Sequence, residues 1–168
     1  DFLTVQNIKI YHAAAILAKV AGILEIGEDE SFFGQSAEEL KGSMVKHLYD
    51  AERKVFIDSY GTRESHQGTN AVAYQYGLVP ENDRETVLEN IAGQGLGTKT
   101  LLSLNLFQVL FENGREEDAY RMLNNTQYPG WGHMMDKGYK TIWEGFDDME
   151  SHSHAWNAYP ARLFLEYI

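Results

Sequence analysis

The segment TVQNIKIYHAAAILAKVAGILEI, residues 4–26, indicates the fold class of this 168-residue chain. Its apolar residues recur at every third or fourth position, which is the period of an α-helix and not that of a strand. Thr4 is a suitable residue to cap the amino end, and Gly27 is expected to end the helix. Because apolar residues lie on more than one side, we expect this helix to pack on two flanks.

The following segments repeat this helical pattern with short turns between them. After a loop that includes Phe32–Gly34, a capping box at Ser36-Ala37-Glu38-Glu39 predicts a second long helix that ends near Phe56. No segment sustains the alternation of a strand. The sequence therefore predicts an all-α fold of stacked antiparallel helical hairpins, as a single unit over residues 1–168. The further helices are expected at about 67–76, 82–91, 99–112, 115–123 and 152–167.

Residues 128–150 differ in composition from the rest of the chain. They contain two of the three tryptophans, together with Pro129 and several glycines. We expect a long structured loop here, with about one helical turn. Long ordered loops often carry the functional residues of a protein, so this segment is the first place to look for a site.

The composition excludes several classes of function. The formal net charge is −11, with 25 acidic and 14 basic residues, which disfavours binding to nucleic acid or to an anionic membrane surface. The chain has no cysteine, so disulfides, thiolate metal sites and thiol nucleophiles are excluded. No apolar run approaches the ~20 residues that span a bilayer. We expect a soluble protein, and the start at Asp1 instead of Met indicates a fragment or a processed product.

Two cofactor-dependent alternatives have limited support. The glycine-rich segment 93–100 lacks the spacing of a phosphate-binding loop and follows a predicted helix, so nucleotide binding is not expected. A metal-dependent hydrolase is conceivable, because imidazole and carboxylate groups bind Zn, Fe or Mn, but the spacing of these residues matches no tight metal motif. We therefore expect no cofactor. The candidate metal ligands would be His133, His152, His154 and Asp136.

Glu144 is the carboxylate with the most suggestive neighbours. It follows Trp143 and precedes Gly145 and Phe146. A carboxylate among aromatic groups is partly removed from water, which suits it to proton transfer. A surface glutamate beside a buried tryptophan would give the same pattern, so the spacing alone leaves both interpretations open.

Several motifs, taken in order, resemble the bacterial α-L-rhamnosidases. The late motifs are YPGWGHM at 128–134, KGYKTIWE at 137–144 and SHSH at 151–154. The upstream segments QGTN to YGLVP, 67–80, and ENGR to DAYRML, 112–123, agree with that family in order and spacing. The resemblance covers nearly the whole chain.

The resemblance implies an (α/α)6 toroid of twelve helices that hydrolyses terminal α-L-rhamnosides with inversion. It implies that Glu144, in the Thr-Ile-Trp-Glu motif, is the general base. It also implies a carbohydrate partner, and this chain would form the C-terminal part of the catalytic domain. The residues expected to contact the sugar are Trp131, Trp143, His154, His133 and Asp136.

Three features depart from the family pattern. The turn at 96–100 differs from the family's threonine-rich helix start, and Gly145 replaces an arginine that usually follows the catalytic glutamate. The family's general acid lies upstream of the motifs in this chain, so the partner that completes the site is expected to be the N-terminal half of the same domain. The alternative is a helical module that binds carbohydrate or protein without catalysis.

Overall fold

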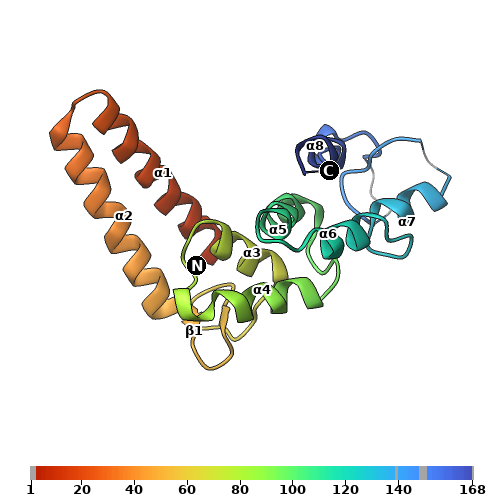
Figure 1. Cartoon of the computed structure of the whole chain (residues 1–168), viewed down its shortest axis with the longest axis horizontal. Helices are drawn as coiled ribbons and strands as arrows, with labels where there is room; N and C mark the ends of the chain where they lie inside the picture. Colours follow the sequence, from red (N-terminus) through yellow and green to blue (C-terminus); the bar gives the residue numbers. More distant parts are fainter. Residues whose placement is uncertain (1–2, 139, 148–150, 168) are drawn as a thin grey trace. The chain divides into compact units, whose positions relative to one another are not determined.

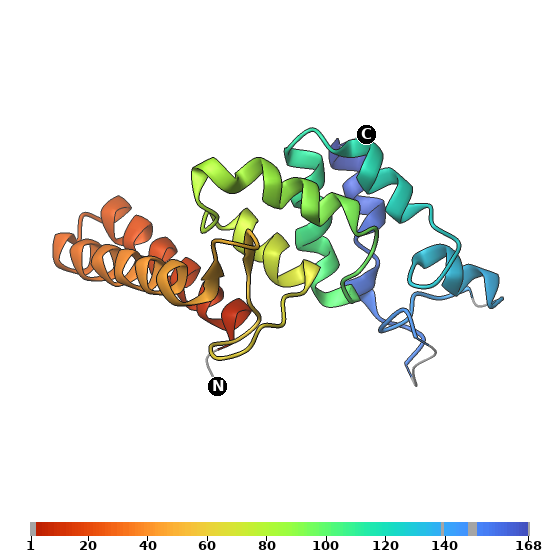
Figure 2. The same ribbon diagram turned by 90° about the horizontal axis from the view of Figure 1, so that it is seen from below.

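The structure is a computed structural model that describes residues 3–138, 140–147 and 151–167 (Figures 1 and 2). Within these residues the chain forms eight α-helices, two short 3-10 helices and one two-stranded sheet. The prediction of an all-α fold is therefore confirmed. The chain divides into two compact units, an N-terminal unit (Asp1–Val87) and a C-terminal unit (Leu88–Ile168), which are described separately.

The N-terminal unit begins with two long helices that lie side by side and run in opposite directions (Figures 1 and 2). They form the first of the helical hairpins that the sequence predicts. A short hairpin of two strands and a largely buried helix follow. The elements are α1 (Thr4–Ile23), α2 (Gly27–Leu48), β1 (Tyr49–Asp50), β2 (Val55–Phe56), α3 (Gln67–Gln75), η1 (Glu81–Asp83) and the start of α4 (Arg84–Gly93).

The turn between α1 and α2 is tighter than the sequence predicts. Glu25 adopts a left-handed conformation with φ of 60°. Its amide donates to the carbonyl of Gly22 at 3.2 Å, and the amide of Ile26 donates to the carbonyl of Ala21 at 2.9 Å. This helix-ending arrangement usually places a glycine in the left-handed position. The prediction that Gly27 ends α1 is therefore wrong, because Glu25 takes that position and Gly27 begins α2.

The predicted capping box at Ser36 is also wrong. Ser36 lies inside α2, where its hydroxyl donates to the carbonyl of Phe32 at 2.8 Å, so the expected loop at 32–34 is helical. Three acidic residues in the first turn favour an earlier start, because negative charge stabilises the amino end of a helix. These residues are Glu28, Asp29 and Glu30.

The β-hairpin ends α2 before the predicted boundary at Phe56. Tyr49 pairs with Phe56, and Asp50 pairs with Val55. The buried side chain of Asn70, on α3, accepts a hydrogen bond from the amide of Phe56 at 2.7 Å. Strand propensity alone does not predict strands this short. They form here because α3 supplies a partner for the hairpin backbone.

Asp58 links the loop after β2 to the start of α3. Its Oδ1 accepts from the His66 amide at 3.1 Å and from the Thr69 hydroxyl at 2.6 Å, while its Oδ2 pairs with Nδ1 of His66. Burial alone would raise the pKa of Asp58. The hydrogen bonds from Thr69 and His66 outweigh burial, and the pKa lies below its usual value.

Replacing Asp58 with asparagine is expected to lower the free energy of unfolding by about 1–2 kcal/mol near neutral pH. The carboxylate pKa is lower in the folded than in the unfolded chain, so this stabilisation is present above about pH 4. It disappears as the pH falls through the folded pKa. Urea unfolding of both proteins at about pH 7 and about pH 2.5 measures the difference. Glu38→Gln, the same charge change at an exposed site on α2, is the control. A loss of equal size at both pH values would contradict the prediction.

The C-terminal unit is built around α5, which packs against α6 and α8. The single helical turn predicted within residues 128–150 is confirmed as α7. The predicted last helix at 152–167 is shorter, because Pro160 begins it and a residue before proline is disfavoured in a helix. The elements are the rest of α4, then α5 (Thr100–Glu112), α6 (Glu116–Leu123), α7 (Trp131–Asp136), η2 (Ala155–Asn157) and α8 (Pro160–Tyr167).

Phe107, on α5, lies at the centre of an aromatic cluster in the C-terminal unit. Its side chain is fully buried, with ring centroids 5.8 Å from Trp131 and 6.4 Å from Tyr159. Trp131 also meets Phe146 edge-on at 4.9 Å. This cluster attaches the irregular segments after α6 to α5. Among the described helices, none has the length and apolarity needed to cross a membrane.

Candidate functional site

Two backbone hydrogen bonds close the segment 142–154 and bring its two ends together. The amide of Glu144 donates to the carbonyl of Ser151 at 3.1 Å, and the amide of His154 donates to the carbonyl of Ile142 at 2.8 Å. As a result, Nε2 of His154 lies 3.8 Å from Oε2 of Glu144. The predicted general base and one predicted sugar contact are therefore neighbours.

The carbonyl group of Glu144 is also held by hydrogen bonds. Its carbonyl oxygen accepts from the Thr100 hydroxyl at 2.9 Å and from Nε1 of Trp156 at 3.0 Å. Thr100 is the first residue of α5, and it is buried. The Glu144 side chain keeps 34 % of its surface exposed. The backbone is thus fixed while the carboxylate remains accessible.

Glu144 lies in the wall of a cavity of about 730 Å³ in the C-terminal unit. This volume is within the range of small-molecule sites, ~300–1,000 Å³. The wall combines aromatic rings with charged groups. Such a wall can bind a ligand that has both apolar faces and polar groups. The lining residues are those from Leu96 to Leu101, Tyr128, Pro129, those from Glu144 to Asp147, and Trp156.

Asp147 gives the cavity a second carboxylate, beside Tyr128 and Lys99. A hydrogen bond from the Tyr128 hydroxyl to Asp147 raises the pKa of Tyr128 above its usual value. Nζ of Lys99 lies 4.0 Å from Oδ2 of Asp147. Both partners of this ion pair are exposed, so its contribution to stability is small. It adds charge of both signs to the wall.

Trp131 and Trp143 are not among the described residues that line the cavity. Trp143 is fully buried and its ring stacks on His152, with centroids 4.8 Å apart. Trp131 is 8 % exposed, and its Nε1 donates to the carbonyl of Asn157 at 2.9 Å. In this arrangement both rings support the segment that carries Glu144. Their role as walls of a sugar pocket stays a prediction.

His133 and Asp136 lie on α7. The ring of His133 meets Tyr128, a lining residue, at 5.6 Å in an edge-on contact, whereas Asp136 is exposed near the end of the helix. The metal-site alternative invoked both residues together with His152 and His154. Within the described residues, no three histidine, aspartate or glutamate side chains gather as metal ligands would.

Trp156 is the functional candidate that the sequence analysis missed. It fell within the helix predicted over 152–167, where an aromatic residue indicates packing. In the structure this helix begins only at Pro160, and Trp156 is 51 % exposed in the cavity wall. Pro160 could have indicated this exposure from the sequence, because proline favours the first position of a helix and so places Trp156 before the helix.

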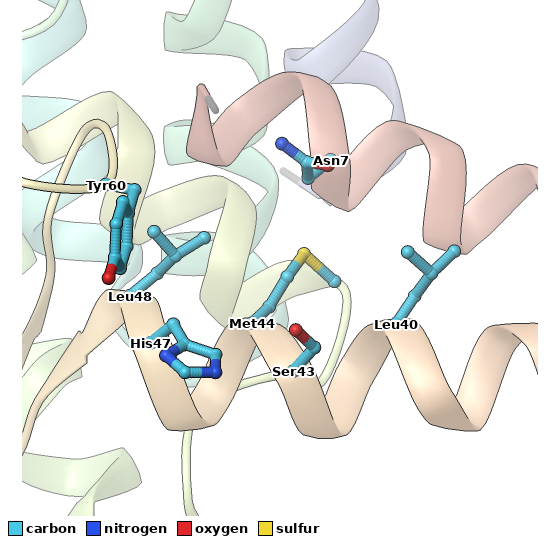
Figure 3. Close-up of a pocket in the computed structure, with 7 residues that line it drawn as sticks. All are labelled: Asn7, Leu40, Ser43, Met44, His47, Leu48 and Tyr60. Atoms are coloured by element: carbon cyan, nitrogen blue, oxygen red, sulfur yellow. The ribbon is translucent and has the colours of Figure 1, made fainter. Parts of the chain in front are cut away.

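A second cavity, of about 370 Å³, lies in the N-terminal unit between α1 and α2 (Figure 3). Figure 3 shows Leu40, Met44 and Leu48 pointing from α2 toward α1, with Asn7 on α1 across from them and Tyr60 at one end. Ser43 and His47 complete the lining. None of these lining residues has a carboxyl group, so this cavity lacks the pair of carboxyl groups that most glycoside hydrolases use.

Residues 2–168 match a family model described as the bacterial alpha-L-rhamnosidase six-hairpin glycosidase domain. An alpha-L-rhamnosidase of Streptomyces avermitilis is 26% identical over 145 residues, which cover 83% of this chain and 13% of that protein. An alpha-L-rhamnosidase of Formosa agariphila is 27% identical over 171 residues, covering 89% of this chain and 17% of that protein. The chain thus spans less than a fifth of the length of either relative.

Solved structures agree with this match. The alpha-L-rhamnosidase from Dictyoglumus thermophilum has a TM-score of 0.78 and 26% identity, covering 94% of this chain and 19% of that one. The GH78 family rhamnosidase of Bacillus sp. GL1 has a TM-score of 0.80 and 22% identity, covering 98% and 19%. At that lower identity the second likeness supports the fold alone.

Proposed function

Because the chain belongs to the bacterial alpha-L-rhamnosidase six-hairpin glycosidase family, we propose that it forms the general-base side of an active site that cleaves terminal α-L-rhamnosides with inversion. The observation that carries this proposal is the placement of Glu144. Its main chain is held at both polar atoms, and its partly exposed carboxylate lies in the wall of a cavity beside His154.

Inversion requires two carboxyl groups ~6.5–9.5 Å apart, one to protonate the leaving oxygen and one to activate water. In this proposal Glu144 removes a proton from the water that attacks the anomeric carbon. The imidazole of His154, 3.8 Å from the Glu144 carboxylate, hydrogen-bonds to a sugar hydroxyl beside it. Contact of the sugar with Trp131, Trp143, His133 and Asp136 stays part of this proposal.

The general acid is proposed to come from helices of the same domain that lie outside these residues. Those helices are then the chief partner of this chain. The family match extends across both compact units, so we propose that the two units are parts of one catalytic domain. L-Rhamnose is the proposed sugar, because a solved relative from Streptomyces avermitilis is an alpha-L-rhamnosidase complexed with L-rhamnose.

The anomer that is released first tests this proposal. The complete domain, meaning this chain together with the helices that complete its fold, should release β-L-rhamnose first from an aryl α-L-rhamnoside. Proton NMR during the first turnovers distinguishes the two anomers before they equilibrate. An aryl α-L-fucoside, with different hydroxyl positions, serves as the control substrate. Release of the α anomer first would mean retention and would refute the proposed mechanism, and absence of hydrolysis would refute the proposed activity.

A further inference from the structure

Trp156, in the cavity wall, contacts both the main chain of Glu144 and the ring of His154. We propose that Trp156 is both a positioning residue and a substrate-binding residue. Its indole N–H fixes the general base, and its exposed ring is a stacking surface for the sugar. Thr100 is the second positioning residue. This inference rests on the proposed role of Glu144.

The exposure of Trp156 differs from that of the other two tryptophans. Trp131 and Trp143 are buried, whereas Trp156 is 51 % exposed and lines the cavity. Its Nε1 nevertheless donates to the carbonyl of Glu144 at 3.0 Å. The polar edge of the ring is therefore directed to the protein, while apolar ring surface remains in contact with solvent. A pyranose ring placed against this surface would remove it from water, which is favourable.

Thr100, the first residue of α5, also contacts the carbonyl oxygen of Glu144. Its hydroxyl donates to Glu144 at 2.9 Å. The carbonyl of Thr100 in turn accepts from the Ser103 hydroxyl at 2.7 Å, and Ser103 is hydrogen-bonded to the hydroxyl of Tyr159. The Glu144 backbone is thereby attached to the first turn of α5, which is a rigid support.

These contacts use all the hydrogen-bonding capacity of the Glu144 peptide groups. A carbonyl oxygen has two lone pairs, and Thr100 and Trp156 occupy both. The amide donates to Ser151. These three hydrogen bonds fix the main chain of Glu144, and they therefore fix the direction of its Cα–Cβ bond toward the carboxylate. A general base misplaced by ~1 Å can lose about 100-fold in rate, so this support matters for turnover.

The contact between Trp156 and His154 extends the support to the second site residue. Their ring centroids are 4.7 Å apart, with the planes tilted by 45°. A single indole therefore touches the backbone of the proposed base and the imidazole proposed to bind the sugar. Losing the whole ring should affect substrate binding as well as turnover, whereas losing only the N–H should affect turnover alone.

Four variants of the complete domain separate these contributions. Thr100→Val removes one donor and keeps the shape of the side chain, whereas Trp156→Phe removes the other donor and keeps a smaller aromatic ring. Each should lower kcat by about 10–100-fold, and KM should rise less in Trp156→Phe than in Trp156→Ala. Thr100→Ser keeps the hydroxyl and should restore kcat to within about 3-fold of wild type. Trp156→Ala also removes the ring and should raise KM by about 10-fold or more. Unchanged kcat in both donor variants would overturn the positioning role, and unchanged KM in Trp156→Ala would overturn the stacking role.

A measurement on the complete domain tests the geometry without catalysis. In ¹⁵N-labelled protein the indole N–H of Trp156 should exchange with solvent more slowly than that of free tryptophan, and L-rhamnose should shift its resonance. Exchange as fast as in free tryptophan would overturn the inference. Glu144→Gln is measured in parallel. Normal turnover of that variant refutes the proposed function, whereas its loss together with normal kcat in Thr100→Val and Trp156→Phe refutes only the positioning role.

Discussion

Replacing Glu144 with glutamine is expected to lower kcat of the complete domain by about 10³-fold or more, equivalent to about 4 kcal/mol of transition-state stabilisation. Glutamine has nearly the same shape, and the hydrogen bonds from Thr100 and Trp156 go to the main chain of residue 144, so the local structure is kept. An amide cannot accept the proton from the attacking water. KM for an aryl rhamnoside should therefore change little while turnover is lost.

The role of Glu144 as the general base can be tested with a nucleophile that does not have to lose a proton. In Glu144→Ala, azide should restore turnover and form a rhamnosyl azide of inverted configuration, because an anion attacks without losing a proton. Glu117→Gln, on the exposed side of α6, makes the same charge change away from the cavity and should leave kcat unaltered. Turnover of Glu144→Gln at the wild-type rate would show that another group is the base.

Replacing Phe107 with alanine is expected to lower the free energy of unfolding of the C-terminal unit by about 3–5 kcal/mol. Phe107 is fully buried between the rings of Trp131 and Tyr159, so its loss leaves a cavity that these large rings cannot easily fill. The three tryptophans of the chain, Trp131, Trp143 and Trp156, all lie in the C-terminal unit. Tryptophan fluorescence during urea unfolding therefore reports on this unit.

Two variants make this measurement specific. Leu165→Ala truncates an apolar side chain of the same unit, on α8, that is 90 % exposed, and should change stability by less than about 0.5 kcal/mol. Phe107→Leu keeps most of the buried volume and should lose clearly less stability than Phe107→Ala. A loss below about 1 kcal/mol in Phe107→Ala would mean that the aromatic cluster does not support the unit.

The sequence predicts helices well where glycine and periodicity agree. Gly77 ends α3 as expected, with φ of 70° and a hydrogen bond from the Leu78 amide to the carbonyl of Ala73. The α1–α2 turn was predicted less well, because Glu25 adopts a conformation that usually belongs to glycine. Ser36 has the residue pattern of a helix start but lies within a helix. A local pattern cannot show that the preceding residues are already helical.

The candidate site was predictable only in part, for a similar reason. Glu144 and His154 could be selected from motif order, and the structure places them 3.8 Å apart. The burial of Trp143 and the exposure of Trp156 depend on the pairing of Glu144 with Ser151 and of His154 with Ile142. Spacing along the chain does not determine such pairing. A tryptophan in a sequence can be a core residue or a binding surface, and only the tertiary contacts distinguish the two.

The closure of the segment 142–154 has a consequence for the choice of variants. The hydrogen bonds between Glu144 and Ser151, and between His154 and Ile142, join main-chain atoms alone. Main-chain hydrogen bonds do not depend on which side chains these four residues carry. We therefore expect these two hydrogen bonds to persist when the side chain of Glu144 or His154 is replaced. Variants at these two positions then report on side-chain chemistry, separately from the fold of the segment.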